Sequence, residues 1–382
     1  MERLETEVII VGGGIVGCST ALHLRQRGVP VILLEQGQTG AAASGVNFGG
    51  VRRNGRALEE LAIAARSLEV WRSMPHLLGS DCEYMVTGHL KLARSEADMV
   101  ALARHAEAQA PFGFKVEMLS RNALLARFPF FGPKVLGAAW CESDGQANPR
   151  LVGPAFARAA RAAGAIIREH SRVSTVARDG ERFLVVCGDD REHHVEVRGR
   201  TLINAAGAWA NQIAASFGEQ AVMEAWSPQM VVTEPFPYFL KPALGVVGGD
   251  VYLRQIPRGN FIFGGGYGDA TLASGRATVM PKETLGSCEL AVQLIPRVAE
   301  ATVIRVWSGF EGITQDHLPV FGPSLTTPGL IHAFGFSGHG FALSPGVGSI
   351  VAELATTGAT DVPLGPLSIG RFAKESAETP GR

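Results

Sequence analysis

Apolar runs and a helical pattern at the start of the chain predict a strand, a helix and a second strand. Residues 7–11 and 31–34 are mostly apolar runs, and residues 15–27 carry apolar side chains at helical spacing up to Gly28. A short apolar run is typical of a buried parallel strand, whereas a 3.6-residue period is typical of a helix. This stretch therefore predicts a βαβ unit.

The patterns beyond this unit predict a mixed α/β chain. Helical spacing extends over residues 58–78, 96–109 and 148–163, and a last helix over residues 345–357 has Ser344 as N-cap and Pro345 at its first position. Other segments predict strands at residues 84–93, 165–168, 173–177, 182–187, 192–197 and 201–204, and a hairpin from residues 251–256 and 261–265. No low-complexity linker separates these elements, so we expect a second lobe interleaved with the first.

Composition narrows the class of protein. The 382 residues contain 35 Lys and Arg against 36 Asp and Glu, and the net charge of −1 gives no basis for binding nucleic acid. The five cysteines form no Cys-x-x-Cys pair, which argues against disulfides and a metal site and favours a cytoplasmic protein. Four glycines interrupt the uncharged run over residues 8–24, so we predict no integral membrane segment.

Three of the 47 glycines form a dinucleotide-binding motif. Gly12, Gly14 and Gly17 lie in a Gly-x-Gly-x-x-Gly pattern between the first predicted strand and helix, and Glu35 ends the second strand. The first glycine permits a tight turn, the second lets the backbone approach a pyrophosphate, and the third lets helix and strand pack closely. The helix N-terminus offers N–H groups to phosphates, and Glu35 can accept hydrogen bonds from a ribose.

Three further turns favour FAD over NAD, which uses the same motif. They are Gly-Ala-Ala-Ala-Ser-Gly at residues 40–45, Asn-Ala-Ala-Gly-Ala-Trp-Ala at residues 204–210 and Gly-Phe-Ser-Gly-His-Gly-Phe at residues 335–341. A dinucleotide with a large planar ring would explain why distant parts of the chain need turns made of small residues.

Together these segments resemble the D-amino-acid oxidase superfamily of flavoproteins. The similarity also includes Thr-Gln-Asp-His-Leu-Pro-Val-Phe-Gly at residues 314–322. The chain most resembles the branch that contains sarcosine oxidase β subunits, glycine oxidase, hydroxyproline dehydrogenases and opine oxidases. This implies a Rossmann-type FAD-binding domain of the glutathione-reductase-like kind, formed by residues 1–83, 145–215 and 310–382. An interleaved substrate domain on an antiparallel sheet would comprise residues 84–144 and 216–309.

The resemblance also implies a set of residues at FAD. The N-terminus of the last helix would point at the flavin, where a helix dipole stabilises the negative charge of the reduced ring. Gly309 lies near the place where some relatives carry a cysteine that tethers FAD, so we expect the cofactor to be non-covalent. The expected cofactor residues are Gly12, Gly14, Ile15, Val16, Gly17, Glu35, Gln36, Ala43, Ser44, Gly49, Gly50, Val51, Val173, Ala206, Gly207, Trp209, Gly309, Gly335, Gly338, His339, Gly340 and Phe341.

Five residues are expected to bind substrate or assist the reaction. The resemblance places His339 close to the flavin, and Arg52 lies in a segment similar to the substrate-facing arginine region of sarcosine oxidases. Tyr252 and Arg254 are two residues apart on a predicted strand, so they share a face and can form a carboxylate clamp. Glu311 can pair with a cationic amine. Each of these residues also has a structural interpretation, as a salt bridge, an edge-strand residue or a residue that closes a turn.

The resemblance implies oxidation of a small amino acid or an N-substituted amino acid. Hydride would pass from the carbon next to nitrogen to flavin N5, giving an imine, and oxygen or another acceptor would take the electrons. Two other classes stay open. One is a flavin-dependent 2-hydroxy-acid oxidoreductase, in which His339 would act as a base. The other is a flavoprotein subunit that needs partner subunits in a hetero-oligomer; a homo-oligomer is also compatible with the sequence.

Overall fold

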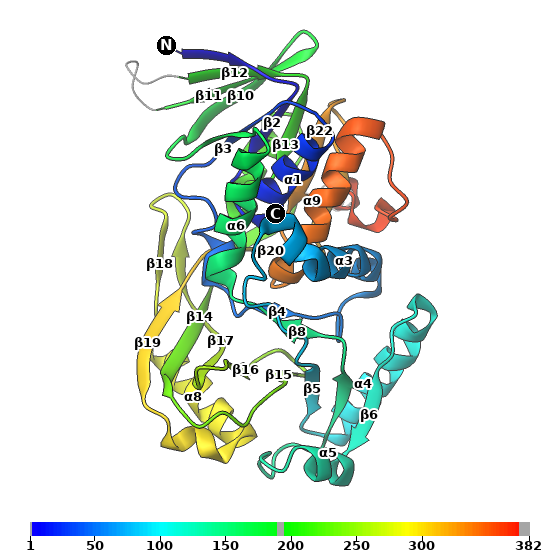
Figure 1. Cartoon of the computed structure of the whole chain (residues 1–382), viewed down its shortest axis with the longest axis vertical. Helices are drawn as coiled ribbons and strands as arrows, with labels where there is room; N and C mark the ends of the chain where they lie inside the picture. The colour runs from blue at the N-terminus through cyan, green and yellow to red at the C-terminus, as the bar shows by residue number, and fades with distance from the viewer. Residues whose placement is uncertain (1, 189–194, 374–382) are drawn as a thin grey trace, which may run out of the picture.

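A six-stranded, mainly parallel sheet contains the first strand of the Gly12 motif (Figure 1). The computed structural model describes residues 2–188 and 195–373, so the predicted strand at 192–197 and the predicted segment 310–382 lie partly outside the described residues. The strands of this sheet run in the order β21 (Val320–Pro323), β22 (Leu330–Phe334), β13 (Thr201–Asn204), β2 (Val8–Val11), β3 (Val31–Leu34) and β9 (Ile166–Arg168). Strands β2 and β3 are parallel and joined by α1 (Ile15–Gln26), which confirms the βαβ unit.

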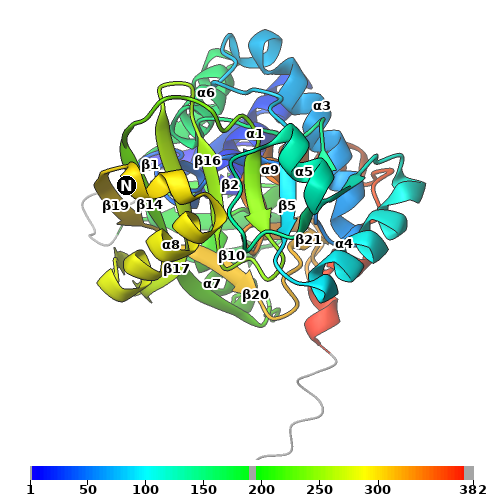
Figure 2. The ribbon, with the colours of Figure 1, turned by 90° about the horizontal axis from the view of Figure 1, so that it is seen from below.

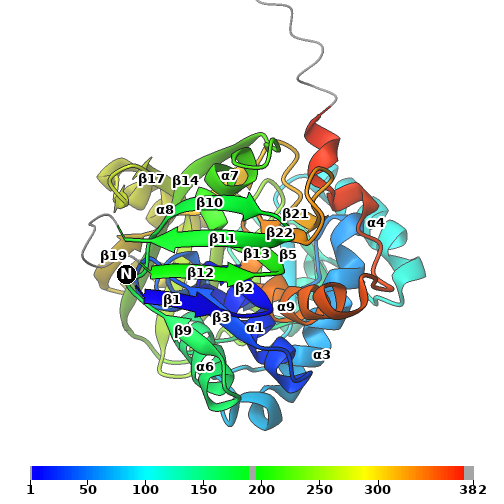
Figure 3. The ribbon, with the colours of Figure 1, turned by 90° about the horizontal axis from the view of Figure 1, so that it is seen from above.

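Alternate side chains of the central strand β2 enter two separate cores. Val8 and Ile10 belong to the core that contains residues of the helices α1, α3 (Leu61–Leu78), α6 (Pro149–Ala162) and α9 (Gly340–Thr357). Ile9 and Val11 instead pack toward a four-stranded sheet that lies across the six-stranded one (Figure 3). Its order is β1 (Glu2–Glu5), β12 (Val195–Gly199), β11 (Arg182–Cys187) and β10 (Val173–Asp179). Because both faces of β2 are covered, its sequence is apolar throughout.

A ten-stranded, largely antiparallel sheet forms the other end of the molecule (Figures 1 and 2). Its main path is β19 (Val303–Ser308), β14 (Met223–Pro235), β17 (Asn260–Thr271), β16 (Tyr252–Gln255), β15 (Ala243–Val246), β5 (His89–Ala93), β7 (Gly137–Cys141) and β6 (Glu117–Ser120). Strand β18 (Arg276–Thr278) pairs with β17, and β20 (Glu311–Thr314) pairs with β14. Strands β16 and β17 confirm the predicted hairpin. The mixed α/β fold with an antiparallel sheet is thus confirmed, while the exact division into two domains stays a prediction.

Shorter elements connect and cover the sheets. The predicted helix over residues 58–78 is a 3-10 turn, Leu58–Glu60, followed by α3, and only the second half of the predicted strand region 84–93 is a strand. No helix among the described residues is long and apolar enough to span a membrane. The remaining elements are α2 (Ala43–Val46), β4 (Gly50–Val51), α4 (Glu96–Gln109), α5 (Arg121–Arg127), β8 (Gly145–Gln146), α7 (Ala210–Ala215), α8 (Pro281–Leu294) and 3-10 turns at Ala110–Phe112, Gly207–Trp209, Pro296–Glu300, Gly365–Leu367 and Ile369–Phe372.

The predicted start of the last helix is wrong. Helix α9 begins at Gly340, so Pro345 lies inside it, and Ser344 is not the N-cap but donates from its hydroxyl to the carbonyl of Gly340 (2.5 Å). A proline inside a helix disturbs the hydrogen bonds beside it. Here Ser67 of α3 repairs the disturbance, because its hydroxyl donates to the carbonyl of Ala342 (2.5 Å) and accepts from the N–H of Gly346 (3.1 Å). Tertiary contact thus lets the helix begin earlier than its sequence indicates.

A substitution at Gly17 tests how closely α1 packs on the turn after β2. A Cβ on Gly17 would overlap the carbonyl oxygen of Gly12. We therefore expect Gly17→Ala to lower the free energy of unfolding by about 1–3 kcal/mol, as for other overpacked sites, in spite of the better helix propensity of alanine. Urea unfolding of the FAD-free and FAD-loaded protein measures this change.

Gly286 of α8 provides the matched control for this substitution. No atom lies within 4 Å of the position that a Cβ on Gly286 would take. Gly286→Ala should therefore raise the free energy of unfolding by about 0.4–1 kcal/mol. Equal stability changes for the two variants would contradict the packing argument.

Candidate active site

A cavity of about 870 Å³ extends from the carboxyl ends of β2, β3 and β13 to the ten-stranded sheet. Val11, Leu34 and Ala205 mark its first end, and Leu244 and Tyr252 lie at the other. Every residue that the sequence assigns to FAD lines this cavity except Gly17 and Val51, which pack behind it. The structure therefore brings the distant glycine-rich turns around one space.

The Gly12 turn leaves backbone N–H groups at the first end of the cavity. Gly12 has φ +110°, which side chains rarely allow, and a Cβ there would overlap the carbonyl oxygen of Ala205. Both the backbone angle and the lack of space therefore require glycine. The carboxylate of Glu35 accepts from the N–H groups of Gly13 (2.6 Å) and Gly37 (2.7 Å), which fixes its position and leaves lone pairs for a ligand. Ser44 accepts from the N–H of Ile15 (3.0 Å) at the start of α1.

Gly309 lies in close contact with the side chain of Val46. A Cβ at this position would overlap Cγ2 of Val46, and Val46 is held in turn because its carbonyl accepts from the indole N–H of Trp307 (2.8 Å). A cysteine at residue 309 would therefore require the backbone or Val46 to shift. This packing agrees with the expectation of FAD that is not tethered at this position.

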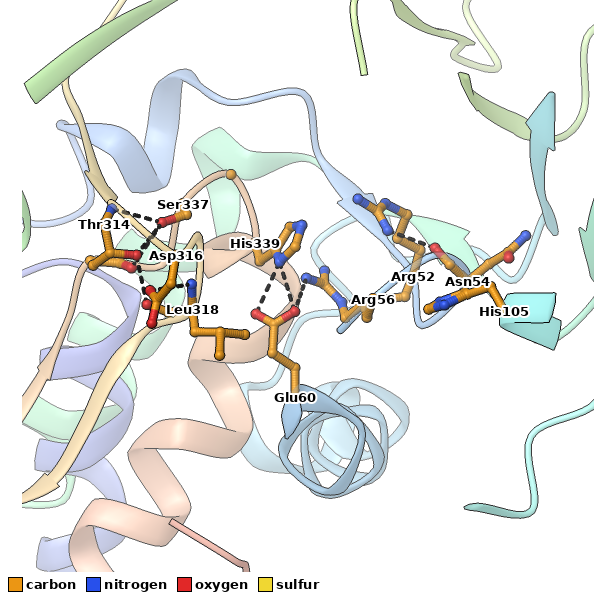
Figure 4. A network of polar contacts seen from close by, with 12 residues as sticks. Arg52, Asn54, Arg56, Glu60, His105, Thr314, Asp316, Leu318, Ser337 and His339 are labelled. Atoms are coloured by element: carbon orange, nitrogen blue, oxygen red, sulfur yellow. Dashed lines mark hydrogen bonds and ion pairs between the residues drawn. The ribbon is translucent and has the colours of Figure 1, made fainter. Parts of the chain in front are cut away.

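A buried glutamate orients His339 at the start of α9 (Figure 4). Nδ1 of His339 lies 2.8 and 2.9 Å from the two carboxylate oxygens of Glu60, whose side chain is fully buried. Burial and the nearby Arg56 lower the pKa of His339 to about 4, so the ring is neutral at pH 7. The neutral ring donates from Nδ1 to Glu60, and this tautomer leaves Nε2 as a hydrogen-bond acceptor.

Glu311 is a second carboxylate in the cavity wall. It accepts from the N–H of Gly338 (2.5 Å), next to His339. Desolvation raises the pKa of Glu311 to about 7, and its charge in turn contributes to the raised pKa values of Tyr252 and Tyr267. An ionised Glu311 therefore gains most from a ligand that brings a positive charge.

The structure separates the candidate arginines. Arg52 lines the cavity, with its guanidinium donating to the carbonyl of Asn54 (2.6 Å). Arg254 is only 4% exposed and does not line the cavity, because its guanidinium donates to the carbonyl of Ala147 (2.9 Å) and packs on the ring of Phe48. Tyr252 does line the cavity, so the predicted Tyr252 and Arg254 clamp is not assembled.

The sequence analysis did not identify several polar residues of the cavity wall, among them His89, Lys91 and Arg56. His89 and Lys91 are alternate residues of β5, so they share a face, and they are the polar positions of an otherwise apolar strand. That interruption is the signal that could have identified them. Arg56 lies four residues before Glu60, and Nε of Arg56 donates to the carbonyl of Arg52 (2.7 Å).

The cavity fits FAD. Its volume is about 870 Å³, it begins at a helix N-terminus with a glycine turn too tight for a Cβ, and it has a fixed carboxylate, Glu35, that can accept hydrogen bonds from a ribose. The N-terminus of the 18-residue helix α9 faces its other part through Gly338, His339 and Gly340. No group of three or more metal-ligating side chains is found among residues 2–188 and 195–373.

Comparison with known proteins agrees with this site. The family model described as DAO, FAD dependent oxidoreductase, matches residues 7–354. The chain is 29% identical over 393 residues to a subunit of the opine oxidase of Rhizobium meliloti, with 98% of this chain and 100% of the relative covered. It is 27% identical over 379 residues to glycine oxidase of Geobacillus kaustophilus (strain HTA426), with 96% and 97% covered.

A solved structure shares this fold over almost the whole length of the match. The crystal structure of L-proline dehydrogenase from P. horikoshii matches with a TM-score of 0.88 and 27% identity, covering 98% of this chain and 99% of that one. Fold, cavity and sequence thus agree over almost the full length, and the chain belongs to the DAO family of FAD-dependent oxidoreductases.

Proposed function

We propose that the protein oxidises a small amino acid or an N-substituted amino acid to an imine. The observation that supports this most directly is that a cation, Arg52, and a carboxylate, Glu311, line the cavity that also contains the FAD motif. An amino acid carries the complementary pair of charges, a carboxylate and an amine. When bound, FAD supplies the two-electron chemistry, by taking a hydride from the carbon next to nitrogen.

The residues of the chain bind and orient the substrate in this proposal. The Arg52 guanidinium holds the carboxylate, and the Tyr252 phenol offers a further donor. Glu311 holds the amine and favours its position next to the N-terminus of α9. That N-terminus stabilises negative charge at this end of the cavity. Correct orientation in a site that excludes water accounts for most of the expected rate enhancement.

Oxidation of a 2-hydroxy acid is a second candidate function, and the geometry of His339 favours it. Loss of hydride from an alcohol requires removal of the hydroxyl proton, which an imidazole can accept. The Glu60 carboxylate fixes the Nδ1 proton of His339, so that Nε2 is available as the base. The same arrangement can instead serve only to position the start of α9.

Partner subunits are a further part of the proposal. The relative from Rhizobium meliloti is named as one subunit of an opine oxidase, and the chain covers all of that relative. We infer that this chain can form a hetero-oligomer that conducts electrons away from the flavin. Co-purification from its native cells, followed by mass spectrometry, tests this inference.

Anaerobic flavin bleaching tests the proposed function. The purified chain is mixed with a panel of D-, L-, N-methyl and cyclic amino acids and with 2-hydroxy acids, and the absorbance of oxidised flavin is followed. We expect amines to bleach the flavin and hydroxy acids to leave it oxidised. Bleaching by hydroxy acids alone would favour the second candidate.

The cofactor should be non-covalent FAD, at about one per chain. Acid precipitation should then leave a yellow supernatant that contains FAD, and colour in the pellet would contradict this expectation. Glu35→Ala should weaken FAD binding by about 10- to 100-fold, as for loss of hydrogen bonds to a charged group. Glu5→Ala is the control, because Glu5 pairs with Arg182 at the surface and should leave FAD binding unchanged.

Arg52 should determine the recognition of the substrate carboxylate. Arg52→Met should lower kcat/KM for the acid substrate, which corresponds to an activation free energy that is higher by about 2–5 kcal/mol. This is the usual cost of removing one partner of a desolvated charge pair. The loss should be smaller for the corresponding amide. Arg53→Met is the matched control, because Arg53 donates to Ser143 outside the cavity. Equal losses for acid and amide would count against the carboxylate contact.

His339→Asn should distinguish amine from alcohol chemistry. For an amine substrate the reactive form is the free base, so this variant should lower the rate of flavin reduction only modestly. For a 2-hydroxy acid the loss of the base should cost about 10²–10⁴-fold. Stopped-flow reduction with the best amine and the best hydroxy acid measures both rates. A large loss with the amine would refute a purely orienting role for His339.

A further inference from the structure

Glu311 is a carboxylate without a cationic partner in the wall of the cavity. It is the first residue of β20, and it lines the cavity. Its Oε1 accepts one hydrogen bond, from the N–H of Gly338 (2.5 Å), and its Oε2 accepts none from residues 2–188 and 195–373. No arginine, lysine or histidine in these two ranges forms an ion pair with it. One carboxylate oxygen is therefore available to a ligand.

Aromatic side chains border this carboxylate. Trp226 of β14 is the register partner of Glu311, and its ring packs edge-on against Tyr267, with 4.8 Å between the ring centroids. Tyr267 and Tyr252 line the cavity, and desolvation, followed by the charge of Glu311, raises the pKa of each phenol. Both phenols therefore keep their protons near neutral pH, and Glu311 is the group beside them that can accept one.

Other groups of the site that can accept a proton are either engaged or weak bases. Glu60 is fully buried and is engaged by His339 and Arg56 (Figure 4). Burial and the charge of Arg56 lower the pKa of His339 to about 4, so its Nε2 holds a proton poorly at pH 7. Burial also lowers the pKa of His89 well below its usual value. The carboxylate of Glu35 is bonded to two backbone N–H groups at the other end of the cavity.

We propose that Oε2 of Glu311 is the base that removes a proton from the substrate ammonium before hydride transfer. This inference rests on the proposed function and makes Glu311 a catalytic residue, beyond its role of holding the amine. The N–H bond breaks, its electron pair stays on nitrogen, and the proton forms an O–H bond with Oε2. An ion pair becomes a neutral carboxylic acid and a neutral amine, and nothing is oxidised or reduced in this step. The lone pair on nitrogen then allows the carbon next to it to release hydride and form the imine.

The surroundings of Glu311 favour this transfer. Removing two opposite charges from water costs free energy, and a proton transfer that neutralises both of them removes that cost. Desolvation raises the pKa of Glu311 to about 7, against a smaller opposite effect of the Gly338 N–H. A base with a pKa near the working pH is efficient, because it is ionised before the transfer and holds the proton afterwards. An aliphatic ammonium in water, by contrast, keeps its proton up to about pH 10.

The pH dependence of flavin reduction in Glu311→Gln tests the base. Glutamine can still accept from the Gly338 N–H, so this variant removes the base and keeps that contact. With the amine that bleaches the flavin fastest, the stopped-flow rate at saturation should be level above about pH 7 in the wild type, where Glu311 is ionised. In Glu311→Gln the amine must lose its proton to water. The rate should then be about 10²-fold lower near neutral pH and should rise with pH toward the wild-type value.

Two control variants limit this effect to Glu311. Glu224 lies on the paired strand β14, is exposed and does not line the cavity, so Glu224→Gln should follow the wild type at every pH. His317 follows β20 and is a further ionisable residue of the cavity wall, and it is exposed. His317→Asn should also keep the level profile. A Glu311→Gln profile parallel to that of the wild type, or a loss in His317→Asn that disappears at high pH, would overturn the proposal.

Infrared difference spectra of the FAD-loaded enzyme detect the proton on Glu311 without turnover. 2-Methylalanine has an ammonium but no hydrogen on the carbon next to nitrogen, so it cannot be oxidised there, and glycine betaine has a quaternary nitrogen without a proton. At about pH 8 Glu311 is mostly ionised before a ligand binds. 2-Methylalanine should then produce the C=O stretch of a protonated carboxylic acid in the wild type, and betaine should not. This comparison also decides the question if Glu311→Gln fails to retain FAD. A carboxylic acid band with both ligands, or with neither, would overturn the proposal.

The two assays distinguish failure of this proposal from failure of the proposed function. Bleaching by amines, with no carboxylic acid band and no pH-dependent loss in Glu311→Gln, would refute the base and leave amine oxidation in place. The band with 2-methylalanine, without bleaching of the flavin by any amine, would refute amine oxidation and leave the proton transfer to Glu311 in place.

Discussion

The close approach of the Gly12 turn to the carbonyl of Ala205 is the constraint on which the rest of the structure depends. It brings the carboxyl ends of β2 and β13 together so tightly that a Cβ cannot fit between them. The glycines beside it then expose N–H groups at the start of α1, and the parallel order of the sheet delivers Glu35 to the same edge. Because strands from distant parts of the chain end there, one cavity can collect residues from almost every segment.

Electrostatics divides this cavity into two functional parts. The part near Gly12 offers backbone donors and one fixed carboxylate, which suits a nucleotide. The part near β5 concentrates arginine and lysine side chains where water is scarce, and only buried carboxylates such as Glu60 oppose them. In such surroundings an unpaired charge interacts more strongly with a ligand than it would in water.

Most residues predicted to bind the nucleotide line the cavity, whereas the predicted Tyr252 and Arg254 pair does not line it together, for a physical reason. Residues of the Gly12 motif are determined by local backbone geometry, which sequence spacing records. Arg254 shares a strand face with Tyr252, as predicted. Its guanidinium, however, donates to the carbonyl of Ala147, which is far away in sequence, and spacing along the strand does not predict this contact. Lys91 was overlooked because it reaches the cavity wall only when β5 lies beside a distant turn. The start of α9 was misjudged because hydrogen bonds from α3 override a local helix-start signal.

Helix α3 packs along α9 (Figure 1), and two side-chain contacts between the segments also fix the length of the chain between Glu60 and Ser67. Glu60, in the turn before α3, contacts His339, the residue before α9. Ser67 of α3 contacts Ala342 and Gly346 of α9. Seven positions are close to two helical turns, so both side chains point the same way. Inserting or deleting one residue between Glu60 and Ser67 would rotate one contact by about 100° relative to the other. Relatives that preserve both contacts can therefore vary this segment in sequence but not in length.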